Sequence, residues 1–282
     1  MDQIKQYLKL IRIKQYIKNF LIFIPVVSAK MLLTSHILKV CLGFVAISLM
    51  ASTIYIINDI RDIENDKKHE TKKYRPLASG KIKVKNATIL SIIMFIGAML
   101  INYLISQNYS TSICLMLYFI SNIAYSFGLK NKPILDVVLL SSGYIIRVYY
   151  GAGLIFIEVS KWLFLTVLFA SMFMGIGKRR NELKSNKGVA RKALTLYNES
   201  FLDKFMYLSL GNIVIFYALW TMEQENQYIF YTIVLVIIIL MQYSLTVEKT
   251  LDGDPTNVLL NNKSILSTSF IYAIIITILL VV

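Results

Sequence analysis

The chain is poor in the residues on which most metal and redox sites depend. Its 282 residues include two cysteines, two histidines and four prolines. Cys41 and Cys114 fall within apolar segments, so we expect two separate buried thiols rather than a disulfide or a metal pair. His36 and His69 each stand alone. Zinc spacings, a Gly-rich dinucleotide loop, a P-loop and a Ser-His-Asp pattern are missing from the sequence, which argues against the enzymes that depend on them.

Acidic residues are also scarce. The chain carries 16 Asp and Glu against 30 Lys and Arg, a net charge of +14, although 56% of its residues are hydrophobic. A mean hydropathy of +0.61 is too high for a soluble domain of this size and indicates an integral membrane protein whose charges lie in loops near anionic headgroups. We expect no nucleic-acid partner, because no basic helix or aromatic platform is present, and no removable signal peptide.

Nine apolar segments predict an all-α membrane protein with a single transmembrane domain, residues 1–282. If residues 1–19 form a helix, one side of it is apolar and the other is rich in Lys and Arg, as in an interfacial helix. Nine spans are expected after it, at 20–35, 38–57, 87–105, 110–127, 134–156, 161–177, 205–222, 227–246 and 265–282.

The cations are distributed unevenly between the ends of these spans. The N-terminus and the loops at 58–86, 128–133, 178–204 and 247–264 carry 26 of the 30 Lys and Arg. Because cytoplasmic loops are enriched in Lys and Arg, we expect the N-terminus and these loops on the cytoplasmic side of a cell (inner) membrane. An odd number of spans then places the C-terminus outside.

Oxygen-bearing side chains are concentrated just past the second expected span. Asn58, Asp62 and Asp66 follow at four-residue spacing, which puts them within an arc of about 80° on one helix face. Such donors suit Mg²⁺, especially Mg²⁺ that also holds a phosphate. Lys72 and Arg75 follow among further lysines. Together these residues predict a diphosphate site, although the cations alone are at least as well explained by the positive-inside bias.

Charges inside expected spans are costly and mark candidate functional sites, and the clear cases are Asp136 and Arg147. Asp136 and Arg147 are separated by close to three helical turns, so they share a face about 16 Å apart. Either a polar cavity faces both, or each pairs with a different helix. Lys178 opens an inner segment whose cations bind phosphate or lipid headgroups. Asp254, before Pro255, is expected to cap a helix.

Three stretches resemble the UbiA superfamily of intramembrane prenyltransferases. NDIRDIEND at 58–66 resembles its first Asp-rich motif, RPLASG at 75–80 the segment after it, and YSFGLKNKPILD at 125–136 the approach to its second motif. The resemblance implies about nine helices around a central cavity, with the polar site on the cytoplasmic side. One departure is that Leu140 stands where a second Asp-x-x-x-Asp pair usually ends, so the site is short of one acidic ligand.

A narrower resemblance is to the branch known as decaprenyl-phosphate phosphoribosyltransferase. Ile13 and Tyr16 stand where that branch usually has Pro and Trp. The resemblance implies a 5-phosphoribosyl 1-diphosphate donor, a polyprenyl phosphate lipid acceptor in the bilayer, and release of pyrophosphate. The matching segments are IRIKQYIKNFLIFIP at 11–25, YIIRVYYGAG at 144–153, GKRRNE at 177–182 and GDPTNVLLNNKSIL at 253–266.

The residues then take expected roles. Mg²⁺ is expected on Asn58, Asp62 and Asp66, which with Asp136 make up the catalytic set. The cytoplasmic loops 58–86 and 178–204 are expected to cap the site. Which cation binds which phosphate stays open, as do the polyprenyl chain length and a homo-oligomeric state. Two other functions also stay open: prenyl transfer from a prenyl diphosphate to an aromatic or other acceptor, and transport. The substrate-binding set is Lys18, Tyr55, Lys72, Arg75, Tyr125, Lys130, Arg147 and Lys178.

Overall fold

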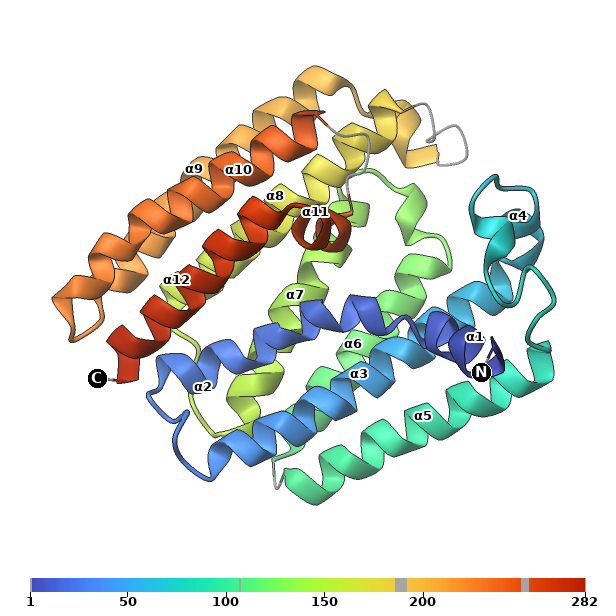
Figure 1. Ribbon diagram of the computed structural model, residues 1–282, viewed down its shortest axis with the longest axis horizontal. Coiled ribbons are helices and arrows are strands. Elements are labelled where there is room, and N and C mark those ends of the chain that lie inside the picture. Colours follow the sequence, from blue (N-terminus) through green and yellow to red (C-terminus); the bar gives the residue numbers. More distant parts are fainter. Residues whose placement is uncertain (1, 107, 186–191, 250–253, 282) are drawn as a thin grey trace.

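Long helices make up the protein. The computed structural model describes residues 2–106, 108–185, 192–249 and 254–281, and in these ranges all regular structure is helical. The long helices run beside one another across the molecule (Figure 1). They are α3 (His36–Arg61), α5 (Val84–Ile105), α6 (Tyr109–Ser126), α7 (Leu135–Leu154), α8 (Lys161–Lys184), α9 (Glu199–Met222), α10 (Ile233–Lys249) and α12 (Lys263–Val281).

The helices form two groups that meet at α7 and α8. In one group α3 packs on α5 and α6 packs on α7; in the other α8 packs on α9 and α10 packs on α12. The N-terminal segment, made of the 3₁₀ helix η1 (Ile13–Phe23) and the short helix α2 (Ile24–Ser28), contacts both groups, through α7 and α12. In Figure 1 it crosses the molecule between them. The interior around this segment is therefore lined by both groups.

Seven helices in the described part of the chain are long and apolar enough to span a membrane, so the expected number of nine is not confirmed. The expected span 20–35 is divided between η1 and α2, and Pro25 starts α2. Helix α6 coincides with the expected span 110–127 but includes several Ser, Thr and Asn side chains and is not among the seven. The other seven expected spans coincide with α3, α5, α7, α8, α9, η6 (Gln227–Thr232) with α10, and α12.

The interfacial helix is shorter than expected. Helix α1 ends at Ile11, and Arg12 adopts left-handed backbone angles, with φ of 56° and ψ of 51°. After this turn η1 runs into the bundle, where Asn19 and Ile22 are buried. A Cβ added to Gly151 of α7 would lie 2.1 Å from the carbonyl oxygen of Ile22, so glycine is needed for η1 to approach α7 this closely.

Two further expectations are corrected. The segment 178–204 does not begin as a loop, because α8 continues through Lys184 and buries Arg179 and Arg180 on the way. Residues 186–191 of that segment lie outside the described residues. Cys41 is exposed on α3 rather than buried, and Cys114 is partly buried, both as free thiols.

The short elements lie in the connections between the long helices. The expected helix cap at Asp254 is confirmed, because its side chain accepts a hydrogen bond of 3.0 Å from the Thr256 amide at the start of α11. These elements are α4 (Ile63–Lys67), η2 (Lys72–Tyr74), η3 (Leu129–Asn131), η5 (Lys192–Leu196) and α11 (Pro255–Asn261).

Candidate active site

The Asp-rich stretch continues the α3 helix with one interruption. Helix α3 ends at Arg61 and α4 begins at Ile63, with Asp62 between them. The Asp62 amide donates to the Asn58 carbonyl over 3.0 Å, and the Asp66 amide donates to the Asp62 carbonyl over 2.8 Å. These bonds keep the four-residue helical connection across the junction, as the spacing predicts.

A carboxylate that the sequence analysis passed over, Asp59, lies at the centre of the charge network here. Asp59 is 3% exposed and forms ion pairs with Arg12 and with Arg75, the latter over 3.1 Å. The same nitrogen of Arg75 lies 2.7 Å from the Asp66 carboxylate. Asp59 and Asp66 are seven residues apart, two helical turns, so they present their carboxylates to one guanidinium.

The remaining two predicted ligands are Asp62 and Asn58. Asp62 lies 3.6 Å from the Lys130 ammonium. The Oδ1 atom of Asn58 is buried and has no hydrogen-bond partner among the described residues, and leaving it so is costly unless a ligand supplies the missing partner. Among the described residues, no three His, Cys, Asp or Glu side chains are grouped closely enough to hold a metal. Two carboxylates with an unpaired amide oxygen still fit a hard cation that shares its remaining coordination with phosphate oxygens.

Arg147 lies deeper in the bundle and is 4% exposed. Its guanidinium donates to the Asn19 side chain over 2.7 Å, the Gly143 carbonyl over 2.6 Å and the Tyr118 hydroxyl over 2.7 Å. It also stacks over the rings of Tyr118 and Tyr144. All these partners are neutral, and no carboxylate in the described part of the chain forms an ion pair with it. Arg147 is therefore a buried cation whose charge is not balanced by these contacts.

A second cationic group lies between η1, α8 and α11. Lys18 and Lys178 approach the two oxygens of Asp254 at 3.8 Å and 3.4 Å. Burial acts to raise the pKa of the Asp254 carboxyl, but Lys178 and Lys18 outweigh it and lower this pKa to about 2. Burial lowers the pKa of Lys18 to about 8; Asp254 opposes this shift, and Lys178 and Arg147 add to it. Lys18 therefore still carries its charge at neutral pH.

Asp136 is fully buried and belongs to a separate network. Its carboxylate accepts from Arg179 Nε over 2.5 Å and from the Tyr197 hydroxyl over 2.7 Å. Arg179 also donates to Glu182 over 2.6 Å and to the Tyr125 hydroxyl over 2.8 Å. Of the two arrangements expected for Asp136 and Arg147, pairing with a different helix thus holds for Asp136 alone, because Arg147 has no ion-pair partner among the described residues. Asp136 contacts neither the Asp-rich stretch nor Arg147.

Tyr55 connects the Asp-rich network to Arg147. The Arg12 guanidinium lies 4.9 Å from the centre of the Tyr55 ring, and Tyr55 interacts electrostatically with both Arg12 and Arg147. Lys72, by contrast, is exposed in η2. The structure therefore brings Arg75 to Asp66, Lys130 to Asp62 and Lys18 to Lys178, and places Lys72 on the surface.

Three charged residues of these networks were missed from the sequence. Asp59 carried a signal, since it precedes Asp66 by seven residues in the same motif. Arg179 also carried one, since it directly follows Lys178 at the end of an apolar span. Arg12 carried no signal, because its position depends on the left-handed turn that ends α1.

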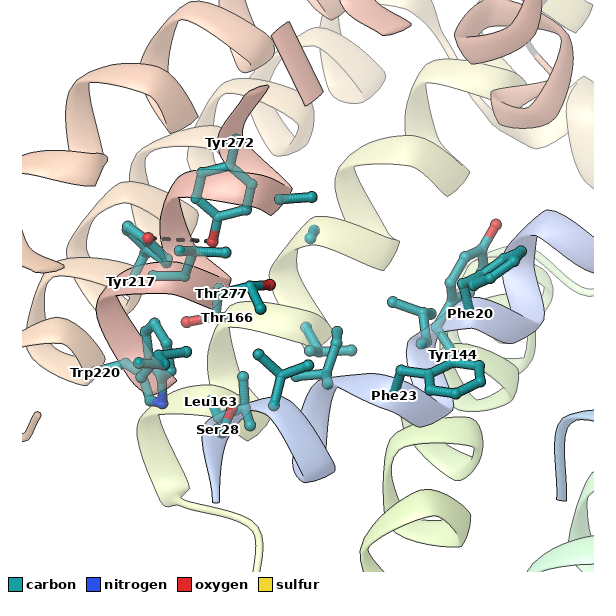
Figure 2. A pocket seen from close by; sticks show the side chains of 18 of the residues that line it. Phe20, Phe23, Ser28, Tyr144, Leu163, Thr166, Tyr217, Trp220, Tyr272 and Thr277 are labelled. Carbon is teal, nitrogen blue, oxygen red and sulfur yellow. Dashed lines mark hydrogen bonds between the residues drawn. The ribbon is translucent and has the colours of Figure 1, made fainter. Parts of the chain in front are cut away.

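An apolar cavity of about 370 Å³ is lined by residues of η1, α2, α7, α8, α9 and α12. Phe20, Phe23 and Tyr144 lie at one end of it, and Tyr217 and Trp220 lie toward the other (Figure 2). Tyr217 accepts a hydrogen bond of 3.1 Å from Tyr272, which joins α9 to α12 across the wall. Because Tyr144 also covers Arg147, one end of this cavity adjoins the buried cation.

Comparison with known proteins agrees with this architecture. Decaprenyl-phosphate phosphoribosyltransferase from Mycobacterium tuberculosis is 30% identical over 266 residues, 90% of this chain and 87% of that protein. Its namesake from Mycolicibacterium smegmatis is also 30% identical, over 91% of this chain and 86% of that protein. A UbiA homologue from Archaeoglobus fulgidus, solved with DMAPP and Mg²⁺, superposes with a TM-score of 0.75 at 20% identity, covering 98% of this chain and 99% of that one.

The model of the family described as UbiA prenyltransferase matches residues 22–265, most of the chain. That range includes α3 with its Asp-rich end, Arg147 on α7 and the cationic end of α8. The apolar helices and the family together make this a multi-pass membrane transferase. The protein belongs to the UbiA prenyltransferase family.

Proposed function

We propose that the protein transfers a 5-phosphoribosyl group from 5-phosphoribosyl 1-diphosphate to a polyprenyl (decaprenyl-type) monophosphate and releases pyrophosphate. The relatives that match nine-tenths of the chain are named for that reaction. The single observation that carries the proposal is Arg147, a buried guanidinium whose hydrogen-bond partners among the described residues are all neutral.

A buried charge without a counter-charge is strongly unfavourable, so Arg147 favours an anionic ligand in the bundle. The Asp-rich end of α3, with Arg75 and Lys130, already offers groups for one diphosphate. Two separate positions for anions suit two phosphorylated substrates. A prenyl diphosphate with a neutral aromatic acceptor would use only one of them.

The proposed chemistry needs no general base. An oxygen of the acceptor phosphate, already anionic, attacks C1 of the ribose as the bond from C1 to the diphosphate oxygen breaks. The bonding electrons leave with pyrophosphate. In the transition state C1 carries partial positive charge between the attacking and the leaving oxygen. Catalysis then consists of positioning and of stabilising the charge on the departing pyrophosphate. In-line displacement predicts inversion at C1.

Asn58, Asp62 and Asp66 would hold Mg²⁺, which when bound withdraws charge from the donor diphosphate. Arg75, already beside Asp66, is placed to exchange that carboxylate for a diphosphate oxygen, and Lys72 on the adjacent surface would add a second cation. We assign Asp136 a positioning role, because its contact is with Arg179, which in turn orients the Tyr125 hydroxyl.

The test is to measure pyrophosphate release by purified protein with each donor. Labelled phosphoribosyl diphosphate with a polyprenyl phosphate should give pyrophosphate and a labelled lipid. A prenyl diphosphate with candidate aromatic acceptors should give neither. Product formation only in the second mixture would replace this proposal with prenyl transfer, and lack of turnover in both would favour a non-enzymatic function.

A further inference from the structure

The cations of the candidate site divide into two groups. Lys130 and Arg75 contact carboxylates of the Asp-rich stretch, whereas Lys18 and Lys178 contact Asp254 from η1 and α8. Lys18 interacts electrostatically with Arg147 as well as with Lys178, so these three cations form one group. We call Lys18, Lys178, Arg147 and Asp254 the deep cation site.

The deep cation site adjoins the apolar cavity. Tyr144 stacks over the Arg147 guanidinium, interacts electrostatically with Asp254 and lines the cavity with Phe20 and Phe23. In Figure 2 these three aromatic residues are grouped at one end of the cavity. A ligand that fills both places must carry an anionic head and an apolar tail.

The charge of the deep cation site matches one kind of anionic head. At neutral pH three cations and one carboxylate leave a net charge of +2. A phosphate monoester carries a charge of about −1.5 to −2 at pH 7. A diphosphate ester carries more negative charge in a larger head, which the Asp254 carboxylate would repel. The composition of the site therefore favours a monophosphate.

We propose that the deep cation site binds the phosphate of a lipid monophosphate, with the first part of its chain in the apolar cavity, and that Asp254 determines the preference for monophosphate over diphosphate. The identity of this lipid as the acceptor rests on the proposed function. The site thus has a ligand, a phosphomonoester on an apolar chain, and a specificity-determining residue outside the Asp-rich stretch.

Asp254→Asn isolates the charge of this residue from its structural role. Asn and Asp are comparable helix caps, so the variant keeps an acceptor for the Thr256 amide while removing the carboxylate charge. Lys18→Met and Lys178→Met remove one cation each, and Lys18→Arg and Lys178→Arg keep the charge. Lys132→Met is the surface control, since Lys132 is exposed on the connection before α7.

The experiment measures dissociation constants of farnesyl monophosphate, farnesyl diphosphate and ribose 5-phosphate at pH 7 in EDTA, so that divalent metal contributes nothing. We expect Lys18→Met and Lys178→Met to weaken farnesyl monophosphate binding at least tenfold, with the Arg variants and the Lys132→Met control within about threefold of wild type. Asp254→Asn should strengthen farnesyl diphosphate binding more than farnesyl monophosphate binding. The ratio of the two dissociation constants, which measures the preference for monophosphate, should fall at least tenfold. Melting curves of every variant identify any that fail to fold.

Two results would overturn the proposal. The first is farnesyl monophosphate binding that is unchanged in the folded Lys18→Met and Lys178→Met variants, or an unchanged preference in Asp254→Asn. The second is dependence on these lysines for ribose 5-phosphate but not for farnesyl monophosphate, which would assign the site to a soluble phosphate. Because these measurements use neither donor nor turnover, failure of the transferase assay would remove the proposed function and leave the binding result intact.

Discussion

The Nε atom of Arg179 lies 2.5 Å from the Asp136 carboxylate, and neither side chain has exposed surface. The pair joins α7 to α8, the two helices at which the halves of the bundle meet. Tyr197 donates to the second carboxylate oxygen, so both oxygens of Asp136 are satisfied within the protein. This network gives Asp136 a stabilising role that needs no ligand.

Asp136→Asn should therefore lower stability. Removing one partner of a buried ion pair typically costs about 3–5 kcal/mol, because the other charge is left without compensation. Arg179 retains Glu182 and Tyr125, which should keep the loss toward the lower end of that range. Thermal unfolding in detergent measures the effect. A variant with wild-type melting and no turnover would instead place Asp136 in the catalytic chemistry.

Gly151→Ala should destabilise the protein through the contact between α7 and η1. The added methyl group would meet the Ile22 backbone at 2.1 Å, and backbone cannot rotate away as a side chain can. Overpacking of this kind costs about 1–3 kcal/mol. Gly211→Ala on α9 is the matched control, since a Cβ there meets nothing within 4 Å. Equal melting temperatures for the two variants would contradict the close approach of η1.

Asp62→Asn and Asp66→Asn should each lower kcat by about two orders of magnitude or more, the usual effect of losing one group that stabilises developing charge. Glu64→Gln is the control within the same helix, because Glu64 is exposed and forms its ion pair with Lys67 at the surface. Turnover against Mg²⁺ concentration measures the effect. Wild-type activity in either Asp variant would remove the metal assignment.

The sequence predicted the helices better than the contacts between them. Apolar segments determine where a span lies, and the expected span 38–57 falls within α3. Which side chains meet depends on how each helix is rotated against its neighbours, and periodicity does not determine this. Hence spacing predicted the helical connection from Asn58 to Asp66, whereas the pairing of Asp136 with Arg179 across two helices was left open and the turn at Arg12 was missed.

The orientation in the membrane is testable with single cysteines. Lys67 lies in α4 beside the Asp-rich stretch, and Ser35 lies at the opposite end of α3. In a Cys41→Ser, Cys114→Ser background, Lys67→Cys should react with a membrane-impermeant maleimide only after the cells are opened. Ser35→Cys should react in intact cells, because the positive-inside bias places it outside. The reverse pattern would place the candidate site on the outer side.

We expect activity to decline at alkaline pH because Lys18 loses its charge there. Its pKa is lowered to about 8 by burial, so the free enzyme loses this charge above about pH 8, whereas Lys18→Arg keeps its charge throughout. We therefore expect kcat/KM for the lipid phosphate to fall above pH 8 in wild type and to stay level in Lys18→Arg. Profiles of kcat/KM between pH 6.5 and 9.5 measure this, since kcat/KM reports groups of the free enzyme.

The effect of Lys18 on folding stability has the opposite pH dependence to its effect on kcat/KM. An unfolded Lys18 keeps its proton to about pH 10.5, so between pH 8 and that value the unfolded chain binds more protons than the folded one. Through Lys18 alone, stability therefore rises with pH across this interval while the charge available to phosphate falls. A decline in kcat/KM above pH 8 with unchanged melting would thus come from the loss of the ammonium. Parallel profiles for wild type and Lys18→Arg would show that Lys18 does not contact the substrate phosphate.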